Sequence, residues 1–106
     1  MNKEQLYELS FHLIAHSGNA RSLAMEAIQA SKKGNFELAV EKLEEADKEF
    51  VNAHRFQTEL IQKEAGGEKY DLPIILVHAQ DHLMTAMTVK DLAIEIVEIY
   101  QRTKKV

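Results

Sequence analysis

The residues with the greatest capacity for chemistry form a polar row around residue 80. The row consists of four residues at positions i, i+3, i+4 and i+7, which is the spacing of one α-helical face: His78, Asp81, His82 and Thr85. The flanking positions are apolar nearly all round the expected helix, which predicts burial on more than one side. Because an unpartnered polar group is costly to bury, the row must be hydrogen-bonded, bound to a metal, or facing a partner surface.

His78 is the candidate nucleophile of this row. A lone histidine on a helix is usually structural, but His78 follows Pro73, which can open a helix, by one to two turns. The positive end of a helix dipole favours an anion such as a phosphoryl group. A neutral imidazole attacks through one nitrogen when an acceptor holds the other, and Gln80, His82 or a backbone carbonyl can serve.

Asp81 has three interpretations: it orients a histidine of the row, binds a metal, or is a satisfied polar group of the core. Its sequence position alone favours the first. Copies of this carboxylate meeting between identical subunits would repel one another, and a hard cation such as Mg²⁺ would remove that cost. A zinc site of His78, Asp81 and His82 is an alternative, although the glutamate of an HExxH motif is absent.

The elements that must position the row are helices. Apolar residues at helical spacing predict helices over Lys3–Ser31, Asn35–Glu64 and Pro73–Lys105. Gly34 is expected to end the first helix, and Asp71 to cap the third. The short and medium connections predict an all-α, antiparallel up-down-up bundle of three helices in a single domain, residues 1–106. The third helix is too apolar for a monomer, so we expect oligomerisation through it.

The composition excludes several classes of function. A net charge of −4 with dispersed lysines argues against a nucleic-acid partner, and the absence of cysteine excludes disulfides and cysteine-based zinc sites. No apolar run of about 18 residues and no signal-like N-terminus occurs. We therefore expect a cytoplasmic protein without membrane insertion, whose partners are proteins or small molecules.

Two features of the first two helices are less readily explained. Gly18 stands in a small, polar turn, where a mid-helix glycine costs about 1 kcal/mol relative to alanine. It either leaves room for a close neighbour or serves helix packing. Gln57 interrupts the apolar seam of the second helix. The remaining histidines are interpreted as structural or exposed, and they are His12, His16 and His54.

Several stretches resemble one known family. Val77–Thr85, with the sequence VHAQDHLMT, resembles the active-site segment of the IIA component of the lactose/cellobiose family of the bacterial phosphoenolpyruvate-dependent sugar phosphotransferase system. Further stretches are similar to that family: Ser17–Ala27, Ala53-His54 with Gln57-Thr58, and Glu64–Lys69. The resemblance spans nearly the whole chain, without departure at the motif positions. Its details look more like the cellobiose/chitobiose branch than the lactose branch.

This resemblance implies a homotrimer of three-helix subunits and a phosphoryl relay for sugar uptake. His78 would accept phosphate from the phosphocarrier protein HPr and pass it to a cysteine of the IIB component, which serves the membrane IIC component. Asp81 would meet its copies at the trimer axis around a structural divalent cation such as Mg²⁺, while Gln80 and His82 would support the site. The transported sugar would be a beta-linked disaccharide such as cellobiose. The alternative is a non-catalytic helical adaptor, in which the polar row only sets the register of assembly.

Overall fold

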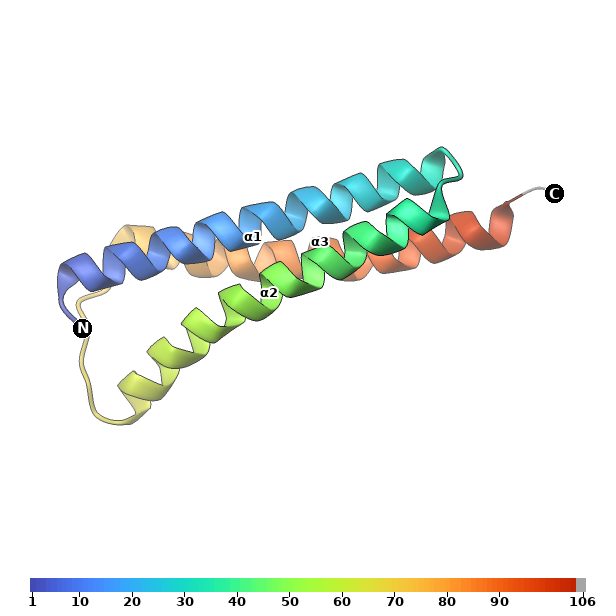
Figure 1. Cartoon of the computed structure of the whole chain (residues 1–106). Helices are drawn as coiled ribbons and strands as arrows, with labels where there is room; N and C mark the ends of the chain where they lie inside the picture. Colours follow the sequence, from blue (N-terminus) through green and yellow to red (C-terminus); the bar gives the residue numbers. More distant parts are fainter. Residues whose placement is uncertain (105–106) are drawn as a thin grey trace.

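The computed structural model, which describes residues 1–104, is a bundle of three long helices (Figure 1). The helices are α1 (Lys3–Lys32), α2 (Phe36–Ala65) and α3 (Ile74–Thr103), and the described residues contain no strand. α1 and α3 run in the same direction, with α2 antiparallel to both (Figure 1). The expected all-α, up-down-up architecture is thereby confirmed. The predicted end of the third helix, Lys105, lies outside the described residues.

The helix ends explain why the boundaries were predictable from local sequence. Asn35 caps α2 by accepting a hydrogen bond from the Leu38 amide at 3.2 Å. Gly34 follows the C-cap of α1 with a φ of +81°, a backbone conformation that favours glycine. The expectation that Asp71 caps α3 is wrong. Pro73 itself occupies the N-cap position in an extended conformation, and no side chain caps this helix end.

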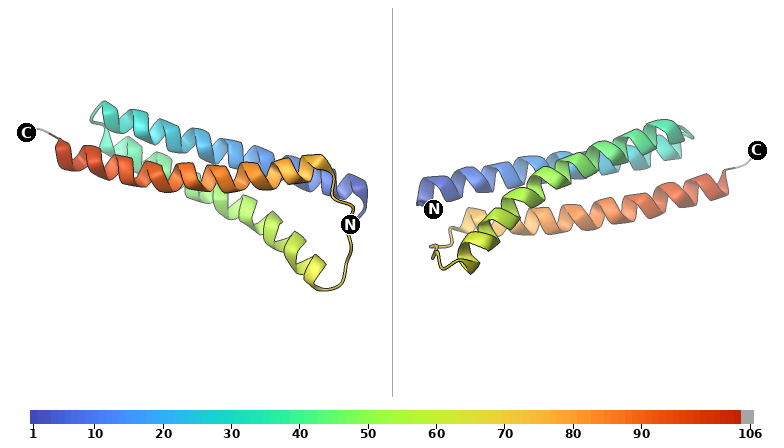
Figure 2. Two further views of the ribbon diagram at one scale, coloured as in Figure 1. Left: turned by 180° about the vertical axis from the view of Figure 1, so that it is seen from behind. Right: turned by 60° about the horizontal axis from the view of Figure 1, so that its bottom comes forward.

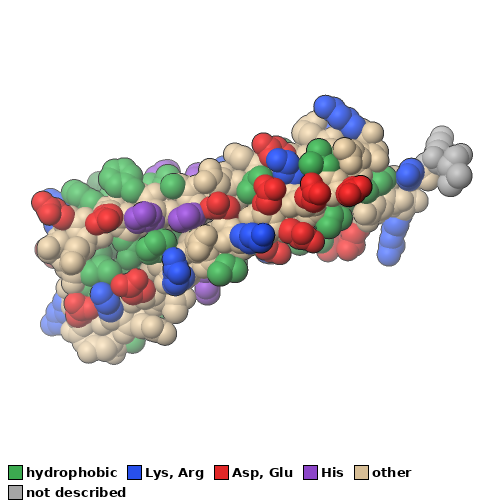
Figure 3. Space-filling model, in the orientation of Figure 1, with side chains coloured by type: hydrophobic (Ala, Val, Ile, Leu, Met, Phe, Trp, Pro, Cys, Tyr) green, Lys and Arg blue, Asp and Glu red, His purple; other side chains and the backbone are tan. Residues whose placement is uncertain are grey.

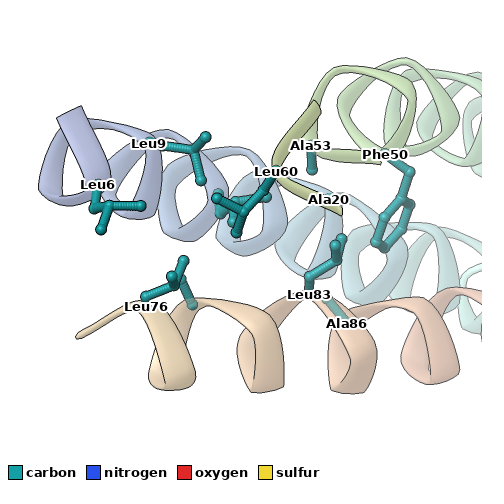
Figure 4. Close-up of a cluster of buried hydrophobic side chains, with 11 residues drawn as sticks. Leu6, Leu9, Ala20, Phe50, Ala53, Leu60, Leu76, Leu83 and Ala86 are labelled. Carbon is teal, nitrogen blue, oxygen red and sulfur yellow. The ribbon is translucent and has the colours of Figure 1, made fainter. Parts of the chain in front are cut away.

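The buried side chains form two clusters of different size along the bundle. In the half that contains the α2–α3 loop, large residues dominate the core (Figure 4), including Leu6, Leu9, Leu13, Phe50, Leu60, Leu76 and Leu83. Near the α1–α2 turn, the smaller cluster consists of Ala27, Ala30, Ala39 and Val97. Since interhelical distance depends on the side chains at the contact, small residues permit a closer approach of the helices at the turn end.

α2 diverges from α3 as it approaches the loop of residues 66–73, as the left view of Figure 2 shows. A groove of about 810 Å³ opens between these helices, and its lining includes Phe50, His54 and Met87. A second groove, of about 1010 Å³, lies between the start of α1 and the loop, and Tyr7 and Leu72 contribute to its lining. The molecule is therefore a rod, 58 × 20 × 17 Å in extent, that is open at its loop end.

A small polar cluster ties the loop to the chain start. The terminal amine of Met1 donates a hydrogen bond to Glu68 at 2.9 Å, and the Tyr70 hydroxyl donates to the same carboxylate at 3.0 Å. The terminal amine, followed by the Tyr70 hydroxyl, lowers the pKa of Glu68. Burial and the hydrogen bond to Glu68 raise the pKa of Tyr70 to about 12.

α3 buries only one of its faces in the single chain. Its inward side carries buried residues such as Leu76, Leu83 and Val97, whereas large apolar side chains remain exposed on the outer side: Ile74, Val77, Met84, Leu92 and Ile99. The expectation that a monomer leaves the third helix too exposed is confirmed for a single copy of the chain, and burial of its outer side by other copies stays a prediction. None of the helices in residues 1–104 has an apolar stretch long enough to cross a membrane.

Candidate functional site

The polar row lies on one face of α3, close to the loop end of the bundle. His78 and Asp81 are exposed and His82 is half-buried. The Thr85 hydroxyl donates to backbone carbonyls of its own helix, those of Asp81 at 3.0 Å and His82 at 3.2 Å, and so does not bind the side chains of the row. Since the row faces outward, the option of a partner surface fits it better than a hydrogen-bonded core.

The two histidines of the row form a pair. The rings of His78 and His82 lie 5.8 Å apart between centroids and are inclined by only 23°. His78 stands one turn inside the N-terminal end of α3, where the helix dipole favours negative charge. An exposed imidazole in that position can attack an incoming electrophile, and its neighbour restricts the directions in which the ring can turn.

His82 reaches from α3 to α1. A Cβ atom added at Gly18 would lie 3.5 Å from the His82 Nε2 atom, so the imidazole faces the position where Gly18 lacks a side chain. The neighbour that approaches Gly18 is thus a histidine ring, not the backbone of another helix. This contact connects the small, polar turn of α1 with the polar row of α3.

Gln80 has a different partner from the one expected. Its side-chain oxygen accepts a hydrogen bond from Gln57 Nε2 at 2.6 Å, so Gln80 is tied to α2 and does not orient His78 through this oxygen. Sequence reasoning noticed that Gln57 interrupts an apolar seam but missed its pairing with Gln80. The available signal was that both polar side chains stand where apolar ones are expected, which makes a shared hydrogen bond the natural solution.

Asp81 is exposed, with the apolar Val77 and Met84 one turn away on either side. Within residues 1–104, no three histidine, aspartate or glutamate side chains converge in a way that can hold a metal ion. A zinc site made by His78, Asp81 and His82 of one chain lacks this convergence. The carboxylate of Asp81 is a suitable oxygen ligand for a hard cation only when further ligands come from outside the single chain.

The remaining histidines have structural surroundings. His16 Nδ1 lies 2.6 Å from Glu49 Oε2, an interaction that joins α1 to α2. His12 stacks on Phe56 with ring centroids 4.9 Å apart, and His54 lies 3.5 Å from the Thr58 hydroxyl. On the face drawn in Figure 3, the histidine side chains gather in the half of the rod that contains the α2–α3 loop.

Comparison with known proteins places this geometry in a family. Residues 8–101 match the family model described as the lactose/cellobiose-specific IIA subunit of the phosphotransferase system. A curated relative, the lichenan-specific phosphotransferase enzyme IIA component of Bacillus subtilis, is 56% identical over 99 residues, which cover 93% of this chain and 90% of the relative.

Solved structures agree with this match. The crystal structure of PtcA from S. mutans superimposes with a TM-score of 0.92 at 48% identity, covering 95% of this chain and 99% of that one. The IIA(Chitobiose) chain solved in complex with HPr, from Escherichia coli, gives a TM-score of 0.82 at 39% identity over 94% and 97% of the two chains. The chain therefore belongs to the lactose/cellobiose-specific IIA subunits of the phosphotransferase system, whose members take part in a phosphoryl relay for sugar transport.

Proposed function

We propose that this chain carries a phosphoryl group on His78. The observation that supports the proposal most strongly is the exposed imidazole near the start of α3, stacked against His82 at 5.8 Å. A lone pair on one nitrogen of His78 forms a bond to phosphorus as the bond to the donor breaks. The phosphohistidine then transfers the group to a thiolate of the acceptor, which restores the free imidazole.

The donor in this proposal is phospho-HPr. The related Escherichia coli IIA(Chitobiose) has been solved in complex with HPr, which supports the same partnership here. The acceptor is a cysteine of the IIB component, which delivers the group to a sugar entering through the membrane IIC component. This chain would act in the cytoplasm, and the sugar would be a beta-linked disaccharide such as cellobiose. Its relatives carry names that refer to lichenan, lactose and chitobiose.

Two further residues of α3, His82 and Gln80, support the acceptor in this proposal. His82 limits the orientation of the His78 ring through their stacked contact. Gln80, whose oxygen is engaged by Gln57 at 2.6 Å, keeps its amide hydrogens as donors for the incoming phosphoryl oxygens. These hydrogen-bond donors would stabilise the negative charge on the phosphoryl group during its transfer.

We also propose that three copies assemble through the outer face of α3. The exposed apolar residues Ile74, Val77 and Met84 on this face would be covered by the same face of the other copies. Asp81 lies among them, so three carboxylates would meet at the axis. A divalent cation such as Mg²⁺ fits this oxygen donor set, and it would supply the charge that permits the carboxylates to approach.

The test is intact-protein mass after incubation with phosphoenolpyruvate, Enzyme I and HPr, in a sample kept alkaline because phosphohistidine is acid-labile. We expect one added phosphoryl group in the wild type and none in His78→Ala. His12→Ala, which removes a histidine stacked on Phe56, is the matched control and should still be labelled. A His78→Ala protein that gains the phosphoryl group contradicts the proposal. If even the folded wild type gains none, the non-catalytic helical adaptor becomes the better explanation.

A further inference from the structure

The arrangement of Gly18, His82 and His78 forms a continuous contact from α1 to the exposed acceptor. His82 is half-buried between the other two: its Nε2 atom faces Gly18, and its ring stacks on that of His78. Within residues 1–104, His82 is the ring that stacks on His78, whose own side chain is exposed. The orientation of the His78 imidazole is therefore tied to the position of His82.

No backbone requirement explains the glycine at position 18. The positive φ angles in the described chain belong to Gly34 and Gly67, so Gly18 has an ordinary helical conformation that any residue can adopt. A glycine in mid-helix costs about 1 kcal/mol relative to alanine. What distinguishes this position is the space above it, which is occupied by the ring of His82.

That space has a definite size. A Cβ atom at position 18 would lie 3.5 Å from His82 Nε2, which is ordinary van der Waals contact. A methyl group would thus just touch the ring. The γ-carbons of valine extend beyond this contact, and valine has few rotamers in a helix with which to avoid the neighbouring ring. A residue larger than alanine must therefore displace the His82 ring, on which the ring of His78 stacks.

We propose that Gly18 is a positioning residue for phosphoryl transfer: by lacking a side chain, it admits the His82 ring that holds the imidazole of His78. The inference rests on the proposed role of His78 as acceptor. Transfer requires the attacking nitrogen to point at phosphorus along the line of the breaking bond. A displacement of about 1 Å in such a group can slow a reaction by roughly a hundredfold.

The first experiment measures single-turnover transfer from phospho-HPr to variants at position 18. We expect Gly18→Val to lower the transfer rate by about tenfold or more, with Gly18→Ala lowering it less, while the HPr concentration for half-maximal rate stays the same. The control is Ala15→Val, which adds the same side chain at an exposed position of α1 and should transfer at the wild-type rate. A wild-type rate in Gly18→Val overturns the inference.

A double-mutant cycle identifies the route of the effect. If Gly18→Val acts by displacing His82, it should cause no further loss in a His82→Ala background, because the ring it displaces is gone. A full additional loss in that background would show that Gly18 acts through another contact, and would overturn the inference. Phosphorylation of His78→Ala is a different outcome, because it would contradict the role of His78 as acceptor. The contact between Gly18 and His82 would then be decided by the NMR signals of the His82 ring.

A spectroscopic readout keeps the inference testable if Gly18→Val folds poorly. In Gly18→Ala, the added methyl touches His82, so the NMR signals of the His82 ring should shift while those of His12, on another face of α1, stay in place. Unshifted His82 signals would mean that the contact with α1 is absent in solution, which contradicts the inference.

Discussion

The two ends of the bundle differ in the size of their core side chains and in how closely the three helices pack. At the turn end, α1 and α2 are joined by residues 33–35, and the core consists largely of alanines. At the loop end, leucines and Phe50 fill the core, α2 diverges from α3, and grooves open beside the helices (Figure 2). The polar row of α3 lies toward the loop end. The comparison teaches that the closely packed end fixes the bundle, while the open end presents side chains to partners.

The largest expected effect comes from truncating the leucine core at the loop end. Leu13 is fully buried, so Leu13→Ala removes apolar contacts and leaves a cavity that should cost about 2 to 5 kcal/mol. Urea unfolding followed by circular dichroism measures the loss. A cost near zero would mean that the open end collapses around the cavity and contributes little to the stability of the bundle.

Overpacking the turn end should have the next largest effect. Ala39 is fully buried among small residues, and Ala39→Leu should destabilise the protein by about 1 to 3 kcal/mol because the helices cannot separate without strain. Val40→Leu, at an exposed neighbouring position, is the control and should change the unfolding midpoint little. Equal stability of the two variants would contradict the close packing inferred for this end.

Two of the three buried serines have no hydrogen-bond partner and sharpen the comparison, because Ser31 lies at the turn end and Ser17 near the middle of α1. The hydroxyls of Ser17 and Ser31 are buried, and no hydrogen-bond partner for either is present in residues 1–104. Replacing either with alanine should stabilise the protein by about 1 kcal/mol. Ser10→Ala is the matched control, because the Ser10 hydroxyl donates to the Leu6 carbonyl at 2.7 Å and its removal should bring no such gain. Thermal unfolding of the three variants decides the point, and a loss of stability in Ser17→Ala would reveal a partner for its hydroxyl.

The smallest expected effect is a pH dependence confined to the loop end. The pKa of Glu68 is lowered in the folded chain, first by the terminal amine and then by the Tyr70 hydroxyl. The stabilisation is therefore present above the pKa of an unfolded glutamate and is lost as the pH falls through the lowered pKa. Amide signals of the loop should move in acid before those of the 33–35 turn, and Glu68→Gln should abolish this difference. Simultaneous movement at both ends would assign the acid response to other groups.

The sequence was most informative where structure depends on neighbouring residues. Helical periodicity, the Asn35 cap and the position of Gly34 are local features, and the structure confirms them within one or two residues. The cap assigned to Asp71 failed because the rigid ring of Pro73 fixes the chain at the position that a capping side chain would use. The local sequence thus predicted the positions of the helices better than it predicted the cap at the start of α3.

Contacts between helices could not be predicted in the same way. The pairing of Gln57 with Gln80 and the approach of His82 to Gly18 depend on which faces meet and at what register. A single sequence indicates which residues share one face of a helix, but it does not indicate which face of another helix packs against them. The spacing of His78 and His82 did predict that they share a face, while the proposed role of His78 came from the motif around it and not from the spacing.

The uncapped start of α3 has a consequence for hydrogen exchange. The amides of Leu76 and Val77 donate to the Pro73 carbonyl at 3.0 and 3.4 Å, whereas those of Ile74 and Ile75 belong to the first turn, which has no partner within the helix. In an isolated chain, deuterium should enter these first amides rapidly and reach later ones slowly. His78 follows this first turn, so the proposed acceptor stands where the backbone bonds of the helix begin, whereas the amides of Ile74 and Ile75 exchange freely with solvent.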